Sequence, residues 1–271
     1  EITEYIQGHP LAAARGVHRT WSSNEKTAVE EALGMSFAGK RALVCMKHVG
    51  MNVAADAFVN SAMTGANGGL VVVAADDPSM HSSQNEQDSR FYGKFALVPT
   101  FEPSTQQEAY DMAKAAFELS ERFRIPVLMR LTTRMAHSRA VVEVTEPRAE
   151  NELHAPADTR RWVLMPGNSR VRYKGLLDDY ARLEEAAAAS PFNAYAEGPD
   201  KRLGIIACGI AHNYVMENYP DGCPHPVLKL SQYPLPRDLV RRMASECQAL
   251  LVVEEGQPVV EEAVRGVLPG P

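Results

Sequence analysis

Residues 41–56 contain the feature that most constrains the fold, a short apolar run that passes through a polar turn directly into a helical pattern. The run from Ala42 to Met46 has the length and the β-forming side chains of a buried parallel strand, and it is too short for a stable helix. After the turn at residues 47–50, apolar side chains recur at helical spacing from Met51 onward. The order predicts a strand, a turn and a helix within this one segment.

Lys47 and His48 lie in that turn, just beyond the end of the predicted strand. In an open parallel sheet, ligands bind outside the carboxyl ends of the strands. We therefore treat both residues as candidate binding residues. A solvated surface turn is the alternative, and the turn by itself does not decide between the two.

The alternation of strands and helices continues over the first half of the chain. Apolar runs typical of strands occur at residues 70–75 and 126–131, and helical patterns occur at residues 22–39 and 104–122. The alternation predicts an α/β domain with a mainly parallel sheet over residues 1–145.

The second half begins with a different composition. Residues 146–200 are rich in charged residues and proline, which indicates a connector, with a surface helix from about Arg172 to Ala189. A smaller α/β domain is predicted at residues 201–271, with at least three strands. Gly209 follows one of these strands, but no G-x-G-x-x-G surrounds it, so no dinucleotide site is predicted.

Two further segments carry candidate site residues. Ser22-x-x-Glu25 fits a capping box, in which the glutamate stabilises the start of a helix; the alternative is a functional carboxylate at Glu25. Residues 80–92 are polar and without clear periodicity, and they include His81 and Gln84. Burying this many hydrogen-bonding side chains in a core would be costly, so we do not expect the segment to be buried. It is a site loop, an intersubunit surface or a plain solvated loop.

Composition excludes several classes of function. The net charge of −6 offers no basic field for nucleic acid. The sequence contains no run of about eighteen apolar residues, so we expect no membrane span. The four cysteines lie far apart without a C-x-x-C pair, which argues against a metal or iron–sulfur site within this chain and suits reduced thiols in the cytoplasm.

The two ends of the sequence also carry an expectation. The chain begins at Glu1 within a helical pattern and without an initiator methionine, and it stops at Pro271 just after a strand–helix unit. We expect it to be a fragment, truncated at both ends.

Several long strings resemble one known family. They are W-S-S-N-E-K-T-A-V-E at residues 21–30, M-K-H-V-G-M-N-V-A-A-D at 46–56, A-D-D-P-S-M-H-S-S-Q-N-E-Q-D at 75–88 and I-I-A-C-G-I-A-H-N-Y at 205–214. They resemble the alpha subunits of indolepyruvate:ferredoxin oxidoreductases, which belong to the thiamine-diphosphate-dependent 2-oxoacid:ferredoxin oxidoreductases. The resemblance covers nearly all of the chain.

The resemblance implies a fold and a division of the cofactor site. Residues 1–145 would form a pyrimidine-binding domain, and residues 201–271 a domain like the C-terminal domain of transketolase. The family's diphosphate-binding domain and its cysteine-rich, ferredoxin-like end are not in this sequence. The Mg²⁺ site and the iron–sulfur clusters are therefore expected outside the chain, and no metal ligand is assigned within it.

The resemblance also implies roles for named residues. Glu25 would be catalytic and would bind the aminopyrimidine ring of thiamine diphosphate, ahead of the capping role, although both could hold. Asn52 would also bind the cofactor. His48 would be catalytic and would share the binding of substrate with Lys47, His81 and Gln84, because a lysine and a histidine suit a carboxylate.

The implied activity is the oxidative decarboxylation of an aryl 2-oxoacid to an acyl-CoA, with ferredoxin as the electron acceptor. Coenzyme A and an arylpyruvate would be the small-molecule reactants, and a beta subunit and ferredoxin the protein partners, in a dimer or hetero-oligomer. Three alternatives stay open: a non-catalytic or split subunit that completes a partner's thiamine site, the same chemistry on another 2-oxoacid, and an unrelated α/β binding domain.

Overall fold

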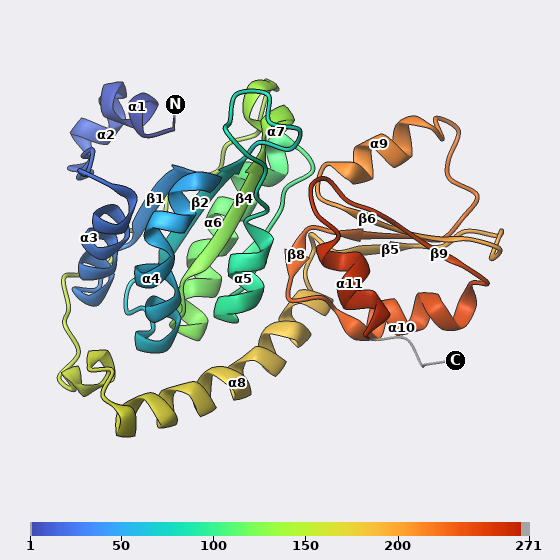
Figure 1. Cartoon of the computed structure of the whole chain (residues 1–271). Helices are drawn as coiled ribbons and strands as arrows, with labels where there is room; N and C mark the ends of the chain where they lie inside the picture. The colour runs from blue at the N-terminus through green and yellow to red at the C-terminus, as the bar shows by residue number, and fades with distance from the viewer. Residues whose placement is uncertain (1, 267–271) are drawn as a thin grey trace.

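The structure is a computed structural model that describes residues 2–266, and these residues form two sheets flanked by helices (Figure 1). The first sheet has five strands in the order β1-β2-β4-β3-β8, and the second has four in the order β5-β7-β6-β9. The predicted α/β class with a mainly parallel first sheet is confirmed.

The first sheet is built from the apolar runs that the sequence shows. β1 (Ala42–Lys47), β2 (Leu70–Asp76) and β4 (Val127–Thr132) pair in parallel, and the short β3 (Thr100–Phe101) extends the parallel order. Helices connect the strands, as parallel pairing requires. They are α4 (His48–Thr64), α5 (Arg90–Ala96) and α6 (Gln106–Phe123). α1 (Ile2–Gly8), α2 (Pro10–Ala14) and α3 (Glu25–Phe37) precede β1, and α7 (Thr133–His137) follows β4.

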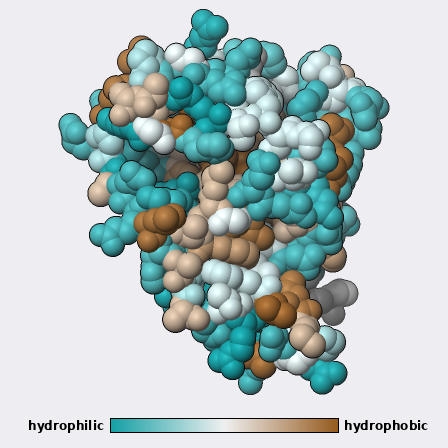
Figure 2. Space-filling view, turned by 90° about the vertical axis from the view of Figure 1, so that its left-hand side faces the viewer, coloured by the Kyte–Doolittle hydropathy of each residue, from teal (hydrophilic) through white to brown (hydrophobic). Residues whose placement is uncertain are grey.

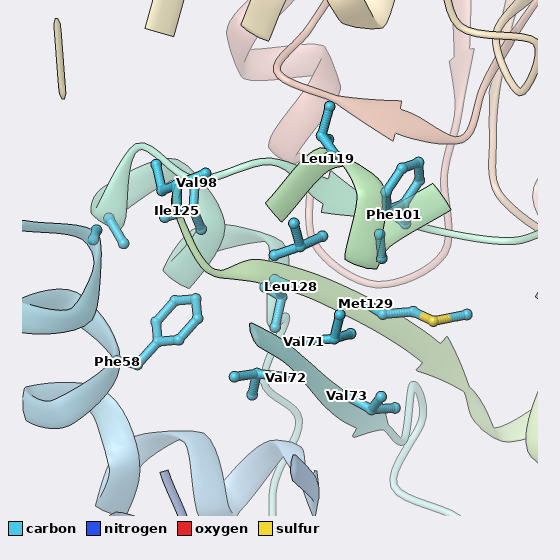
Figure 3. Close-up of a cluster of buried hydrophobic side chains, with 14 of the residues drawn as sticks. Phe58, Val71, Val72, Val73, Val98, Phe101, Leu119, Ile125, Leu128 and Met129 are labelled. Carbon is cyan, nitrogen blue, oxygen red and sulfur yellow. The ribbon is translucent and has the colours of Figure 1, made fainter. Parts of the chain in front are cut away.

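Helices on both faces of the first sheet bury its side chains. Phe58 of α4 lies on the side of the strands toward which Val72 points, and Val71 and Leu119 of α6 lie on the other (Figure 3). Alternating side chains of β2 therefore enter two apolar layers, and this explains why Leu70 to Ala74 are all apolar and nearly free of solvent contact.

The start of α4 differs from the sequence prediction. The segment Lys47–Gly50 was predicted to be a polar turn before a helix from Met51, but the helix begins at His48 and Lys47 is its N-cap residue. The first backbone N–H groups of a helix have no intrahelical partner, so a polar first turn has the same sequence pattern as a loop. β1 therefore passes into α4 without a turn between them.

The second sheet takes its strands from two of the predicted segments. β6 (Gly204–Cys208), β7 (Val227–Leu230) and β9 (Leu250–Val253) are parallel, and β5 (Ala194–Ala196) adds an antiparallel edge strand from the end of the predicted connector. The helices of this unit are α9 (Ala211–Glu217), α10 (Arg237–Glu246) and α11 (Val259–Arg265). Its core includes Ile206, Leu228, Val240 and Met243.

Two elements join the sheets. β8 (Gln232–Tyr233) follows β7 in the sequence but pairs antiparallel with β3 of the first sheet. α8 (Pro166–Ala188) runs from the first sheet to the second (Figure 1), after the short 3₁₀ helix η1 (Thr159–Trp162). α8 begins six residues before the predicted Arg172, because Pro166 occupies the first helical turn, where proline is tolerated. Among the helices of residues 2–266, none is long and apolar enough to cross a membrane.

Two phenylalanines on neighbouring helices provide a test of the packing. Phe58 of α4 is fully buried and Phe95 of α5 is 73% exposed. We expect Phe58→Ala to lower the free energy of unfolding by about 3–5 kcal/mol, since it leaves a cavity in the first core. Phe95→Ala is the matched control and should change it by about 0.5 kcal/mol or less. Urea unfolding measures both; similar losses in the two variants would contradict the packing described.

Candidate functional site

The candidate site lies at the carboxyl edge of the first sheet. β1 ends at Lys47, β2 at Asp76 and β4 at Thr132, so the segments that follow these strands gather at one edge. The two main components are the amino end of α4 and the loop of residues 77–89 between β2 and α5, which we call the site loop. This is the edge at which ligands bind in open α/β sheets.

Glu25 is the first residue of α3, and it does not serve as a cap. The side chain of Asn24 caps the helix and accepts a hydrogen bond from Thr27 N at 3.0 Å, whereas Ser22 donates to Glu31 at 2.8 Å. The predicted capping box between Ser22 and Glu25 is therefore wrong. Two N-capping residue types stand close together here, and the structure selects the second.

The carboxyl group of Glu25 lies against the first turn of α4. A Cβ atom placed on Gly50 would lie only 2.6 Å from Cγ and 2.9 Å from Oε1 of Glu25, so the approach requires a glycine. Within residues 2–266, the half-buried Glu25 carboxylate makes no hydrogen bond or ion pair with another side chain or with the backbone. It is thus available to a ligand.

His48 is fully buried at the amino end of α4. Its Nε2 atom lies 3.1 Å from the carbonyl oxygen of Asn85 in the site loop, and its Nδ1 atom 3.4 Å from that of Ala75 in β2. A neutral imidazole donates from only one nitrogen, so only one of these contacts is a full hydrogen bond at a time. In this arrangement the ring holds the site loop against α4, and direct contact with a ligand requires the loop to move.

Lys47 and Asn52 are exposed and face the elements next to α4. Lys47 Nζ donates to the carbonyl oxygen of Ser82 in the site loop at 3.2 Å. The side-chain oxygen of Asn52 accepts a hydrogen bond from the hydroxyl of Tyr92 in α5, and burial raises the pKa of that hydroxyl. Lys47 therefore connects the start of α4 to the site loop, and Asn52 connects α4 to α5.

Asp77 fixes the first half of the site loop. Its carboxylate accepts hydrogen bonds from Thr133 Oγ1 at 2.6 Å and from the backbone N–H groups of Ser82 and His81, at 2.8 and 3.2 Å. These donors, first that of Thr133, hold the pKa of Asp77 well below its usual range. The side chains of His81 and Gln84 are exposed and hydrogen bond to no described residue.

The structure thus brings the six candidate residues to one edge in two groups. Glu25 lies against the first turn of α4 and Asn52 projects from α4 to Tyr92 of α5, while Lys47 and His48 contact the backbone of the loop that carries His81 and Gln84. Sequence reasoning missed Gly50, Tyr92 and Asp77. The only sequence signal for Asp77 was its position directly after a predicted strand. For Gly50, the only signal was the residue type itself.

Comparison with known proteins identifies the class. Residues 5–174 match the family described as pyruvate flavodoxin/ferredoxin oxidoreductase, thiamine diphosphate-binding. The match covers more than half of the chain, and the chain therefore belongs to this family of thiamine-diphosphate-binding oxidoreductase domains.

Curated relatives of the chain carry a more specific name. The chain is 46% identical over 255 residues to indolepyruvate oxidoreductase subunit IorA of Archaeoglobus fulgidus, covering 91% of this chain and 40% of that protein. It is 43% identical over 271 residues to the IorA subunit of Methanothermobacter thermautotrophicus, covering 98% and 44%. The resemblance expected from the sequence is confirmed. The chain spans about two fifths of the length of these relatives.

Two solved structures share the fold. A 2-oxoglutarate:ferredoxin oxidoreductase from Magnetococcus marinus aligns with a TM-score of 0.70 at 14% identity, over 94% of this chain and 53% of that chain. An inactive split-gene transketolase tetramer aligns with a TM-score of 0.58 at 17% identity, over 99% of this chain and 76% of that chain. The predicted likeness to thiamine-dependent enzymes and to transketolase is confirmed at the level of the fold.

The donor set at the site fits the aminopyrimidine part of thiamine diphosphate but not a metal. The carboxylate of Glu25, which has no hydrogen-bond partner in the described part of the chain, can accept a hydrogen bond from a ring nitrogen, and it lies against Gly50. By contrast, no group of three or more His, Cys, Asp or Glu residues in the described part of the chain is placed to hold a metal ion.

The low pKa of Asp77 makes a prediction about stability and pH. A carboxyl group whose pKa is depressed in the folded state stabilises the protein above its unfolded pKa, about 3.9, and loses that contribution as the pH falls through the folded value. We expect Asp77→Asn to lower the free energy of unfolding by about 1–3 kcal/mol at pH 7 and at pH 5. The difference should shrink at pH 3. Urea unfolding at the three pH values measures it, and a difference that grows toward pH 3 would contradict the hydrogen bonding described.

Proposed function

We propose that this chain provides the aminopyrimidine side of the cofactor site in an enzyme that oxidatively decarboxylates aryl 2-oxoacids of the indolepyruvate type. The products would be an acyl-CoA and electrons passed to ferredoxin. The observation that carries the proposal is the half-buried carboxylate of Glu25, which has no partner among the described residues and lies against Gly50. The family match and the names of the relatives support the cofactor and the substrate class.

Glu25 would act through a proton on the cofactor. When bound, thiamine diphosphate supplies the carbanion chemistry of decarboxylation, and the protein supplies orientation and electrostatics. The Glu25 carboxylate accepts a hydrogen bond from the protonated aminopyrimidine nitrogen and so holds the proton there.

The substrate would be held from the site loop and from the start of α4. Lys47 offers a positive charge for the carboxylate of a 2-oxoacid, and His81 and Gln84 offer hydrogen-bonding side chains that the loop leaves exposed. His48 would act by holding the loop in place through Asn85, and it would approach substrate only when the loop opens. Asn52 would contact the cofactor together with its partner Tyr92.

The rest of the site would come from outside these residues. The diphosphate group with Mg²⁺ and the iron–sulfur clusters would lie in other parts of the enzyme, with a beta subunit and ferredoxin as partners in a dimer or hetero-oligomer. On the face of the molecule that includes α3, hydrophobic residues gather near the middle of a largely hydrophilic surface (Figure 2). Large apolar side chains near the site are partly exposed, among them Val53 of α4 at 49%. Such exposure supports a covering partner.

Replacing the carboxylate tests the role of Glu25. We expect Glu25→Gln in the full-length enzyme with its partner subunit to lower kcat for an arylpyruvate at least ~100-fold, since an amide cannot hold the proton. Glu30→Gln is the matched control, because Glu30 lies on the same helix and is exposed, 3.9 Å from Lys26. Both variants should unfold at the same urea concentration. Full activity of Glu25→Gln would end the assignment.

Gly50 provides a test that removes no polar group and changes no charge. A methyl group at Gly50 has to displace Glu25, whereas a methyl group at Gly34 of α3 meets no described atom within 4 Å. Gly50→Ala should therefore weaken the binding of thiamine diphosphate with Mg²⁺ about tenfold, the loss of one hydrogen bond to a charged group. Gly34→Ala should bind normally and gain up to about 1 kcal/mol in stability. Calorimetric titration of the full-length enzyme measures both, and equal affinities would count against the site geometry.

A further inference from the structure

A cluster of buried charged side chains lies next to the candidate site, where the first sheet meets the segment that follows β9 of the second sheet. We call it the ionic cluster, and it consists of Asp76, Asp88, Arg90, Glu102, Arg130 and Glu254. The side chains of the first five are no more than 2% exposed, and that of Glu254 is 8% exposed. Charges so far from water are tolerated only when they are paired and hydrogen bonded.

Arg130 of β4 connects the members of the ionic cluster. Its Nε atom donates to Asp76 at the end of β2 at 2.6 Å, and its Nη1 atom donates to Glu102. Its Nη2 atom donates to the backbone oxygen of Glu255, beyond β9, at 2.8 Å. One guanidinium group therefore contacts the strand that leads into the site loop and a segment of the second unit.

The last residues of the site loop are held by the same carboxylates. Asp76 accepts a hydrogen bond from Ser89 N at 2.9 Å and another from the Ser89 hydroxyl. Burial would raise the pKa of Asp88, but Arg130 and Arg90 outweigh it and hold that pKa below its usual value. Carboxyl groups therefore hold both ends of the site loop: that of Asp77 at its start, and those of Asp76 and Asp88 at its end.

A short segment of the second unit, residues 254–257, completes the ionic cluster. Glu254 binds Arg90 Nη1 at 2.8 Å, and Gln257 N donates to Asp88 Oδ2 at 3.1 Å. Arg90 Nη2 donates to the carbonyl oxygen of Gln257 at 2.9 Å. Between them, Gly256 has a φ of +105°, and a Cβ there would lie 2.7 Å from Asp88 Oδ2 and 2.9 Å from Arg130 Nη2. The segment fits against the ionic cluster because it has no side chain at this position.

We propose that residues 254–257 of the second unit set the conformation of the site loop through Asp88, Arg130 and Asp76. Arg130 is then a positioning residue, because it is buried among protein groups and acts through the base of the loop whose Asn85 carbonyl contacts His48. Movement of the second unit changes the position of His81 and Gln84. The link to substrate rests on the proposed function, whereas the link to loop conformation does not.

Gly256 and Gly222 make a matched pair for the test. Their φ angles are +105° and +104°, so alanine has the same backbone strain at both positions. A methyl group at Gly256 clashes with Asp88 and Arg130, whereas one at Gly222 meets no described atom within 4 Å. Neither variant alters a charge. The difference between Gly256→Ala and Gly222→Ala therefore isolates the contact between the second unit and the ionic cluster.

The experiment uses the full-length enzyme with its partner subunit and has two readouts. Hydrogen exchange of peptides covering residues 77–89 should rise about tenfold in Gly256→Ala and stay unchanged in Gly222→Ala, since displacement of Arg130 and Asp88 also loosens Asp76, the acceptor of Ser89 N. In steady-state kinetics, Gly256→Ala should raise KM for the 2-oxoacid about tenfold, while the affinity for thiamine diphosphate and magnesium is unchanged.

The outcomes separate the two proposals. Unchanged exchange of the site loop in Gly256→Ala overturns the coupling, whatever the kinetics show. Faster exchange with an unchanged KM supports the coupling, but it contradicts the proposed role of His81 and Gln84 in binding substrate. If Gly256→Ala fails to fold, Arg130→Lys answers the same question, because the ammonium group keeps the charge but cannot span both Asp76 and the Glu255 carbonyl. Faster loop exchange is expected in that variant too, and normal exchange there overturns the proposal.

Discussion

Burial of the Arg130 charge is the constraint on which the rest of this structure depends. The guanidinium group is 1% exposed, and attraction to Glu102, Asp88 and Asp76 outweighs burial and raises its pKa. A buried guanidinium group needs a hydrogen-bond acceptor at each of its three nitrogens. For Arg130 these acceptors are Asp76 of β2, Glu102 in the segment before α6 and the carbonyl oxygen of Glu255 in the loop after β9. The two sheets and the loop of the candidate site are therefore held by one set of charges, and the loss of any partner leaves the others buried and uncompensated.

The sequence predicts the elements whose signal is local and strong. The apolar runs of β1 and β2 and the apolar periodicity of α6 identify these elements to within a few residues. The signal is strongest for β2, because burial on both faces of the sheet requires consecutive apolar side chains. The site edge could also be predicted, since it follows from the parallel order of the strands. Lys47 and His48 were predicted to lie at this edge because they follow a predicted strand, and the role of Glu25 was predicted from the family resemblance.

Features that depend on distant contacts could not be predicted. Ser22 and Asn24 are both good capping residues, and the structure uses Asn24, while Glu25 has no hydrogen-bond or ion-pair partner within residues 2–266. The full burial of His48 depends on Asn85, far along the chain. Arg130 in an apolar strand indicates a buried ion pair, but nothing local shows that its acceptors include the Glu255 carbonyl, 125 residues away.

The path of the chain between β7 and β8 has a consequence for exchanging parts between relatives. Ser231 alone separates β7 in the second sheet from β8 in the first, and Asn193 clamps the crossing by accepting from the backbone N–H groups of Ser231 and Gln232 at 2.8 and 2.9 Å. So short a crossing cannot act as a flexible tether. A chimera joined at the boundary of either sheet would therefore leave β3 without its edge partner, and only an exchange that keeps β7, β8 and Asn193 from one parent preserves both sheets.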